Sequence, residues 1–169
     1  ALAAKGAAAI INPAHRRAAT SWRIGMRGGL CSWLGQRLAV PFAQLGLCPE
    51  FASSLLLPKL AGYPRAAEKL LLGEAFLAQE ALEMGLISKI LPLDELRPFA
   101  ERQAAKLVAL PAASVRATKA LMKRARTPAI NDAMDAENKL FAAMLLAPEA
   151  KEAMTAFMEK RKPDFSKFA

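Results

Sequence analysis

Residues 45–54 read Leu-Gly-Leu-Cys-Pro-Glu-Phe-Ala-Ser-Ser, and this stretch is the most informative in the chain. Its turn-like beginning leads to Pro49, which suits the first position of a helix because proline has its φ already fixed. Glu50 is the one acid in this otherwise uncharged segment. Loss of solvation raises a carboxyl pKa and makes the group a better base near neutral pH. A structural interpretation stays open, because the helix dipole also favours a negative charge in the first turn.

The chain before Glu50 differs in composition from the rest. The net charge of +9 comes from 24 Lys and Arg against 15 Asp and Glu, and +6 of it lies before Glu50, where there is no acid. Residues 12–37 show neither a helical nor a strand period, and our hypothesis is that residues 12–36 are a frame-shifted or otherwise disrupted segment. Residues 38–42 then predict a short strand. The charge therefore argues only weakly for a nucleic-acid partner.

Local stop signals predict the elements that follow Glu50. Pro58 is expected to interrupt the first helix, since proline removes a backbone N–H and clashes with the preceding turn. Gly73 and Gly85 are suited to end two short helices. The predicted elements here are helices over 65–72 and 78–84 and a strand over 86–91.

The last third of the chain is predicted to be helical. Apolar residues recur at helical spacing from residue 96 to residue 158, and Thr127 has the character of an N-cap. The Met and Phe side chains on these faces are expected in the core, although the faces over 130–145 and 153–158 could also contact partner subunits. The basic tail, residues 160–168, is expected to be extended.

Other classes of site are disfavoured by the residues themselves. Cys31 and Cys48 have no spacing that predicts a metal site or a disulfide, so we expect two thiols in a reducing, cytoplasmic compartment. Ser53 and Ser54 lack the context of an activated nucleophile. No apolar run has the length of a membrane span.

The order of several blocks resembles the second half of crotonase-superfamily proteins, the enoyl-CoA hydratase/isomerase family. The resemblance runs from Leu38 to Phe168, and its order and spacing make it specific. It is carried by residues 45–54, by Leu-Pro-Lys-Leu-Ala-Gly (57–62), by Arg-Ala-Ala-Glu-Lys-Leu-Leu-Leu-Gly-Glu (65–74), by Gln-Glu-Ala-Leu-Glu-Met-Gly-Leu (79–86) and by Phe-Met-Glu-Lys-Arg-Lys-Pro (157–163).

This resemblance implies a fold class and a division of the chain. The implied fold is α/β, a crotonase-like ββα-spiral fragment with a mainly helical C-terminal region that forms trimers. The division would be residues 1–37 as an atypical or disrupted remnant of the core, 38–92 as the second half of the core, and 93–169 as the helical region.

The same resemblance implies the chemistry. Family hydratases use two Glu, and the position of the first is occupied here by Phe42, whereas Pro49-Glu50 matches the single catalytic Glu of Δ3,Δ2-enoyl-CoA isomerases. Two backbone N–H groups would stabilise the thioester enolate. One comes from a segment that would precede Ala1, and the other from a glycine-rich loop for which Gly25 is a loose positional candidate.

The implied partner is an acyl-CoA thioester, processed in fatty-acid metabolism without a metal and without a cofactor beyond the coenzyme A of the substrate. Besides Gly25 and Phe42, the candidate substrate-binding residues are Leu47, Phe51 and Lys162, with Lys162 near the nucleotide. The expected function is conversion of a 3-enoyl-CoA to a 2-trans-enoyl-CoA with Glu50 as the base. The alternative is a truncated, catalytically inactive homologue that acts only as an oligomerising subunit.

Overall fold

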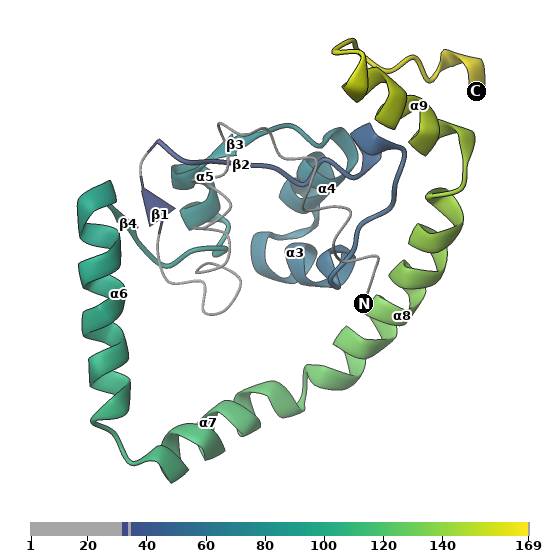
Figure 1. Cartoon of the computed structure of the whole chain (residues 1–169). Coiled ribbons are helices and arrows are strands. Elements are labelled where there is room, and N and C mark those ends of the chain that lie inside the picture. Colours follow the sequence, from purple (N-terminus) through teal and green to yellow (C-terminus); the bar gives the residue numbers. More distant parts are fainter. Residues whose placement is uncertain (1–31, 34, 169) are drawn as a thin grey trace.

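The computed structural model describes residues 32, 33 and 35–168. Short strands and helices are mixed in its first part, and its second part is helical (Figure 1). In chain order they are β1 (Ser32–Trp33), β2 (Arg37–Leu38), η3 (Ala43–Leu45), α3 (Ser53–Ala61), α4 (Tyr63–Leu72), β3 (Phe76–Leu77), α5 (Ala78–Glu83), β4 (Ile90–Leu91), α6 (Leu93–Val108), α7 (Ala112–Arg124), α8 (Thr127–Met144), α9 (Pro148–Met158) and η4 (Ser166–Phe168). Helices and paired strands are both present, as the α/β prediction requires.

The strands form two small pairs. β1 pairs with β4 in parallel, with Ser32 opposite Ile90, and β2 pairs with β3 antiparallel, with Leu38 opposite Phe76. Both predicted strands are shorter than expected. Each segment pairs with its neighbour over two residues only. Of the predicted strand over 38–42 the ladder contains Leu38, and of the predicted strand over 86–91 it contains the last two residues.

A small core lies where α5 meets β2, β3 and β4. It contains Phe76, Ala78, Ala81, Met84 and Ile87, all nearly inaccessible to solvent. Because most of these side chains are small, the backbones of the surrounding elements can approach closely. Lys69 of α4 is buried beside this cluster.

The buried Lys69 ammonium is neutralised by two carboxylates. Its Nζ lies 2.7 Å from Glu68 and 2.6 Å from Glu80, and 5.6 Å from the centre of the Phe76 ring. These partners raise the Lys69 pKa, chiefly through hydrogen bonds to Glu68 and Glu80. The pair with Glu80 joins α4 to α5 at the edge of the core.

The helix ends confirm two local predictions and overturn a third. α4 ends at Leu72 with Gly73 in the left-handed region, and Gly85 follows α5 with φ of +72°, as predicted. Pro58 does not interrupt its helix, because α3 continues through it to Ala61. The Gly62 amide donates to the Pro58 carbonyl at 3.0 Å, so the last turn closes normally after the proline.

Helices α6, α7, α8 and α9 trace an open arc around the α3–α5 region (Figure 1). α6 packs on β1, α8 on α3 and α9 on η3, while α7 joins the two sides of the arc. None of the residues of α6 and α7 is buried. The arc therefore packs on the rest of the described fold through α6 at one end and through α8 and α9 at the other.

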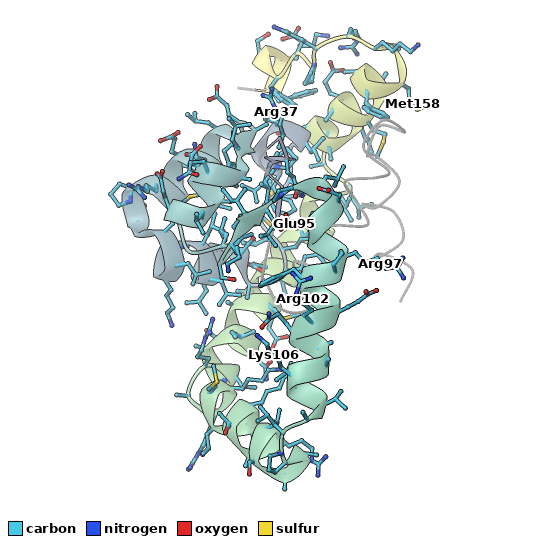
Figure 2. All side chains as sticks on the ribbon, turned by 90° about the vertical axis from the view of Figure 1, so that its left-hand side faces the viewer. Arg37, Glu95, Arg97, Arg102, Lys106 and Met158 are labelled. Atoms are coloured by element: carbon cyan, nitrogen blue, oxygen red, sulfur yellow. The ribbon has the colours of Figure 1, made fainter. Side chains whose placement is uncertain are left out.

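None of the Met and Phe side chains on these helical faces is fully buried, so the prediction that they form the core is not met. Four of them are half-buried: Phe99, Met134, Phe141 and Met144. Met122, Met154, Phe157 and Met158 are all exposed, although Met84, which directly follows α5, is buried. In Figure 2, Met158 lies at the end of α9. Charged side chains lie along the length of α6: Glu95, Arg97, Arg102 and Lys106. The helical period was correct, but among residues 32, 33 and 35–168 no second layer covers these faces of the arc.

Two further local expectations need correction. Thr127 is the first residue of α8 and not its N-cap, since its hydroxyl donates back to the Lys123 carbonyl at 2.9 Å and so links α7 to α8. The tail is not wholly extended, because Ser166–Phe168 form a 3-10 turn. That turn is held by Asp164, whose carboxylate accepts from the Ser166 amide and hydroxyl.

Candidate active site

Glu50 begins a tight turn that leads into α3. Phe51 and Ala52, the two central residues, both have positive φ values, 60° and 56°. The Glu50 carbonyl accepts from the Ser53 amide at 3.1 Å and from the Ser53 hydroxyl at 2.6 Å. Left-handed conformations cost about 1–2 kcal/mol for each residue with a Cβ, so this turn needs support from its surroundings. The sequence had suggested that the helix begins at Pro49, but it begins at Ser53.

The support comes from Glu137 of α8. Its carboxylate accepts from the Ala52 amide at 2.6 Å, from the Ser54 amide at 2.9 Å and from the Ser54 hydroxyl. Ala52 is the N-cap of α3 and has no side chain that could cap it. Glu137 therefore satisfies the free amides of the first turn from another helix, where the dipole also favours its charge.

Burial and a neighbouring charge change the acidity of this loop. The pKa of Glu50 is raised above its ordinary value, first by loss of solvation and then by the negative charge of Glu137. The pKa of Cys48 is raised chiefly by burial, and the Cys48 thiol donates to the Glu137 backbone carbonyl at 3.6 Å. Glu50 is thus a half-buried carboxyl with increased basicity, as its apolar neighbours predicted.

The C-terminal tail is fastened to α9 by an ion-pair cluster. Arg161 pairs with both carboxylate oxygens of Glu152, and its Nε lies 2.6 Å from Glu159. Glu152 also accepts from the Asp164 amide at 2.9 Å. Hydrogen bonds from Arg161 and Asp164 lower the pKa of Glu152 to about 2. Lys162, beside this clamp, lines a hollow of about 460 Å³ together with Gln44 and Leu45 of η3.

Replacing Glu152 with Gln is expected to release this tail. Because the folded-state pKa of Glu152, about 2, lies below the ordinary 4.5, the pair stabilises the tail above pH 4.5 and is lost as the pH falls toward 2. At neutral pH the variant should be cut by trypsin after Lys160 and Arg161 several-fold faster than the parent. Glu159→Gln, which removes a more exposed partner, should have a smaller effect. Equal cleavage of Glu152→Gln and the parent would contradict the clamp.

The comparisons with known proteins decide the family. The sequence model of the protein family described as enoyl-CoA hydratase/isomerase matches residues 35–167. The chain belongs to the enoyl-CoA hydratase/isomerase family. The match begins close to Leu38, where the resemblance to this family begins in the sequence.

Hydratases and isomerases both occur among its relatives. The chain is 33% identical over 125 residues to the crotonyl-CoA hydratase of Syntrophomonas wolfei, covering 74% of this chain and 48% of that protein. It is 28% identical over 130 residues to the 1,2-epoxyphenylacetyl-CoA isomerase of Escherichia coli, covering 77% and 50%. The chain therefore spans about half the length of these relatives.

A solved structure confirms the crotonase-like α/β fold. The enoyl-CoA hydratase/isomerase from Pseudoalteromonas atlantica has a TM-score of 0.76 and 34% sequence identity over 80% of this chain and 55% of that one. The division at residues 37 and 92 remains a prediction. Among the described residues, no helix has the length and apolar character needed to cross a membrane.

The structure gathers only some of the sequence-predicted site residues. Phe51 follows Glu50 in the strained turn and is exposed. Phe42 is the N-cap of η3, and its carbonyl accepts from the Leu45 and Leu47 amides at 2.9 Å. Phe42 and Leu47 are thus joined in a single turn, which precedes the Glu50 loop. Lys162 lies apart, against η3, and Gly25 falls outside the described residues.

Glu137 is the residue beside the Glu50 loop that sequence reasoning missed. It lies in the face Ile130, Met134, Phe141 and Met144, which is otherwise apolar. A lone acid within such a face is the signal that could have found it, since a buried carboxylate requires hydrogen-bond donors. Its exposed fraction is 5%, and within the described part of the chain its carboxylate binds the Ala52 amide and the first turn of α3.

Proposed function

We propose that this protein isomerises 3-enoyl-CoA to 2-trans-enoyl-CoA with Glu50 as the single proton carrier. The supporting observation is the unequal state of two carboxylates. Glu137 is occupied by three hydrogen bonds, whereas the Glu50 carboxylate accepts none from protein groups among the described residues. Glu50 also has a raised pKa, as a base that works near neutral pH requires.

The proposed step moves one proton within the substrate. The Glu50 carboxylate takes a proton from C2, and the electron pair of that bond enters a dienolate extending from the thioester oxygen to C4. The protonated Glu50 then delivers the proton to C4, leaving the double bond between C2 and C3. Neither water nor an electron is consumed, so the proposal includes no metal and no cofactor apart from the coenzyme A of the substrate.

Water addition is less well supported. It uses a second carboxyl to activate water, and Phe42 stands at the position that resembles the first Glu of the hydratases. Phe42 has no group that can accept or donate a proton. Glu137 cannot take this role without giving up its hydrogen bonds at the start of α3, which would leave the buried Ala52 amide unsatisfied.

The test is an assay of the full chain with two substrates. We expect a 3-enoyl-CoA to be converted to its conjugated 2-trans isomer, and a 2-trans-enoyl-CoA to gain water much more slowly. Hydration faster than isomerisation would contradict single-base chemistry. No turnover of either substrate would favour the alternative, an inactive subunit.

Assembly with further copies is part of this proposal, because the arc carries uncovered apolar side chains. Those exposed on α8, on α9 and in the connection between them are Leu140, Leu145, Leu146, Met154, Phe157 and Met158. When exposed apolar side chains form a patch, they mark a site of protein contact, and the proposal is that these do. We expect light scattering at micromolar concentration to give a mass of three chains or a multiple of three, and a monomer would contradict the assembly.

A cytoplasmic location is also proposed. It is supported by Cys48, which is a free thiol in the described part of the chain. Free thiols persist where the compartment is reducing.

A further inference from the structure

We propose that Glu137 is a positioning residue that holds the Glu50 loop in its working geometry from helix α8. This inference rests on the proposed function of Glu50 and adds to it the means by which the carboxyl is placed. It follows from the contacts of Glu137 and from the conformation of the turn that Glu137 supports.

The turn cannot be held by its own residues. Phe51 and Ala52 are consecutive residues in the left-handed conformation, and both carry a Cβ. Glycine would adopt this conformation without strain. The hydrogen bonds within the loop all go to the Glu50 carbonyl from Ser53, and none of them fixes the amide of Ala52. Without an outside partner, the Ala52 and Ser54 amides would be buried or half-buried donors at the start of a helix.

Glu137 holds the loop on both sides of Glu50. Its carboxylate binds Ala52 and Ser54 after Glu50, and its backbone carbonyl accepts from the Cys48 thiol before Glu50. A displacement of α8 would therefore move the Glu50 segment as a unit. A misplacement of about 1 Å at a reacting group can reduce a rate by about 10²-fold, so this anchoring is of a size that matters for turnover.

The charge of Glu137 acts on Glu50 as well. Among the described residues, Glu137 supplies the charge that raises the Glu50 pKa beyond the effect of burial, and the Cys48 thiol lies within the field of both carboxylates. Removing the Glu137 charge should lower the Glu50 pKa toward its ordinary value. The acidic limb of the pH–rate profile then moves to lower pH, a change that a purely structural role would not produce.

Two substitutions at this position separate charge from geometry. Glu137→Gln keeps the size but replaces one accepting oxygen with an NH₂ group that faces a donor. We expect kcat to fall by about 10²-fold, with KM changed much less. The acidic limb of the pH–rate profile should shift to lower pH. Glu137→Asp keeps the charge but withdraws it by one methylene, so kcat should fall while the limb stays near that of the parent.

Controls on both helices make the comparison specific. Asp135→Asn makes the same charge change at an exposed position of α8 and should leave kcat and the limb unchanged. Ser54→Ala removes one donor to Glu137 and should give a smaller loss of kcat than Glu137→Gln. If Glu137→Gln does not fold, Glu137→Asp and Ser54→Ala decide on the same readouts.

A measurement without substrate distinguishes failure of this inference from failure of the proposed function. In the full chain carrying ¹³C-labelled glutamate carboxyls, NMR titration should show the Glu50 pKa falling in Glu137→Gln, and the Ala52 and Ser54 amides should exchange about tenfold faster with solvent. These changes in a parent that lacks isomerase activity would reject the function and retain the positioning. An unchanged Glu50 pKa and unchanged exchange, or wild-type kcat and pH profile in folded Glu137→Gln, would overturn the inference.

Discussion

Replacing Glu50 with Gln is expected to reduce isomerisation of a 3-enoyl-CoA by about 10²–10⁴-fold, the range in which removal of a general base acts. Gln has nearly the shape of Glu but cannot carry the proton from C2 to C4. The turn should survive, because its bonds involve the Glu50 backbone carbonyl and not its carboxylate. Binding of substrate should therefore change less than kcat.

The pH dependence of the parent gives an independent check. A base must be ionised to accept a proton, and the Glu50 pKa is raised by burial and by Glu137. The rate should therefore rise with pH through a midpoint above the ordinary carboxyl value of 4.5, and this limb should be absent from the residual activity of Glu50→Gln. Glu74→Gln, at an exposed position, is the matched control and should behave as the parent. Equal, nonzero rates in Glu50→Gln and the parent would remove Glu50 from the mechanism.

The parts of the fold that sequence predicted are those decided within a few residues. Gly73 and Gly85 end their helices because the left-handed conformation there is free of a Cβ penalty. Pro58 was misjudged because a proline in a helix of nine residues loses one intrahelical bond, which packing on α8 and α4 can offset. Burial along the arc was misjudged because periodicity shows which residues share a face and not whether anything covers it.

The candidate site divides in the same way. Glu50 could be found because its apolar neighbours are adjacent in sequence, and local burial is what raises its pKa. Glu137 could not be placed, because its partners Ala52 and Ser54 lie 85 and 83 residues earlier in the chain. Only the packing of α8 on α3 brings them together. Sequence thus led to Glu50, the proposed proton carrier, and tertiary structure was needed to find the residue that holds its loop.

Replacing Gly46 with Ala is expected to destabilise the fold by about 2–4 kcal/mol, for two separate reasons. Gly46 ends η3 in the left-handed region, with φ of 65° and ψ of 28°, where a Cβ is strained. A Cβ there would also lie 2.8 Å from the Glu149 carbonyl carbon and 2.9 Å from the Ala150 nitrogen, in the first turn of α9. Backbone atoms on both sides cannot yield as a flexible side chain could, so η3 and α9 must separate.

The matched control is Gly85→Ala, which isolates the conformational part of this effect. Gly85 has φ of +72°, and the nearest atom to its Cβ position is the Leu60 carbonyl oxygen at 4.0 Å, an ordinary contact. It should therefore cost about 1–2 kcal/mol, and thermal unfolding of Gly46→Ala should occur roughly 5–15 °C below the parent and clearly below Gly85→Ala. Equal destabilisation by the two substitutions would mean that α9 does not press on η3. Because η3 immediately precedes the Glu50 loop, Gly46→Ala should also lower isomerase activity in the fraction that remains folded, whereas Gly85→Ala should not.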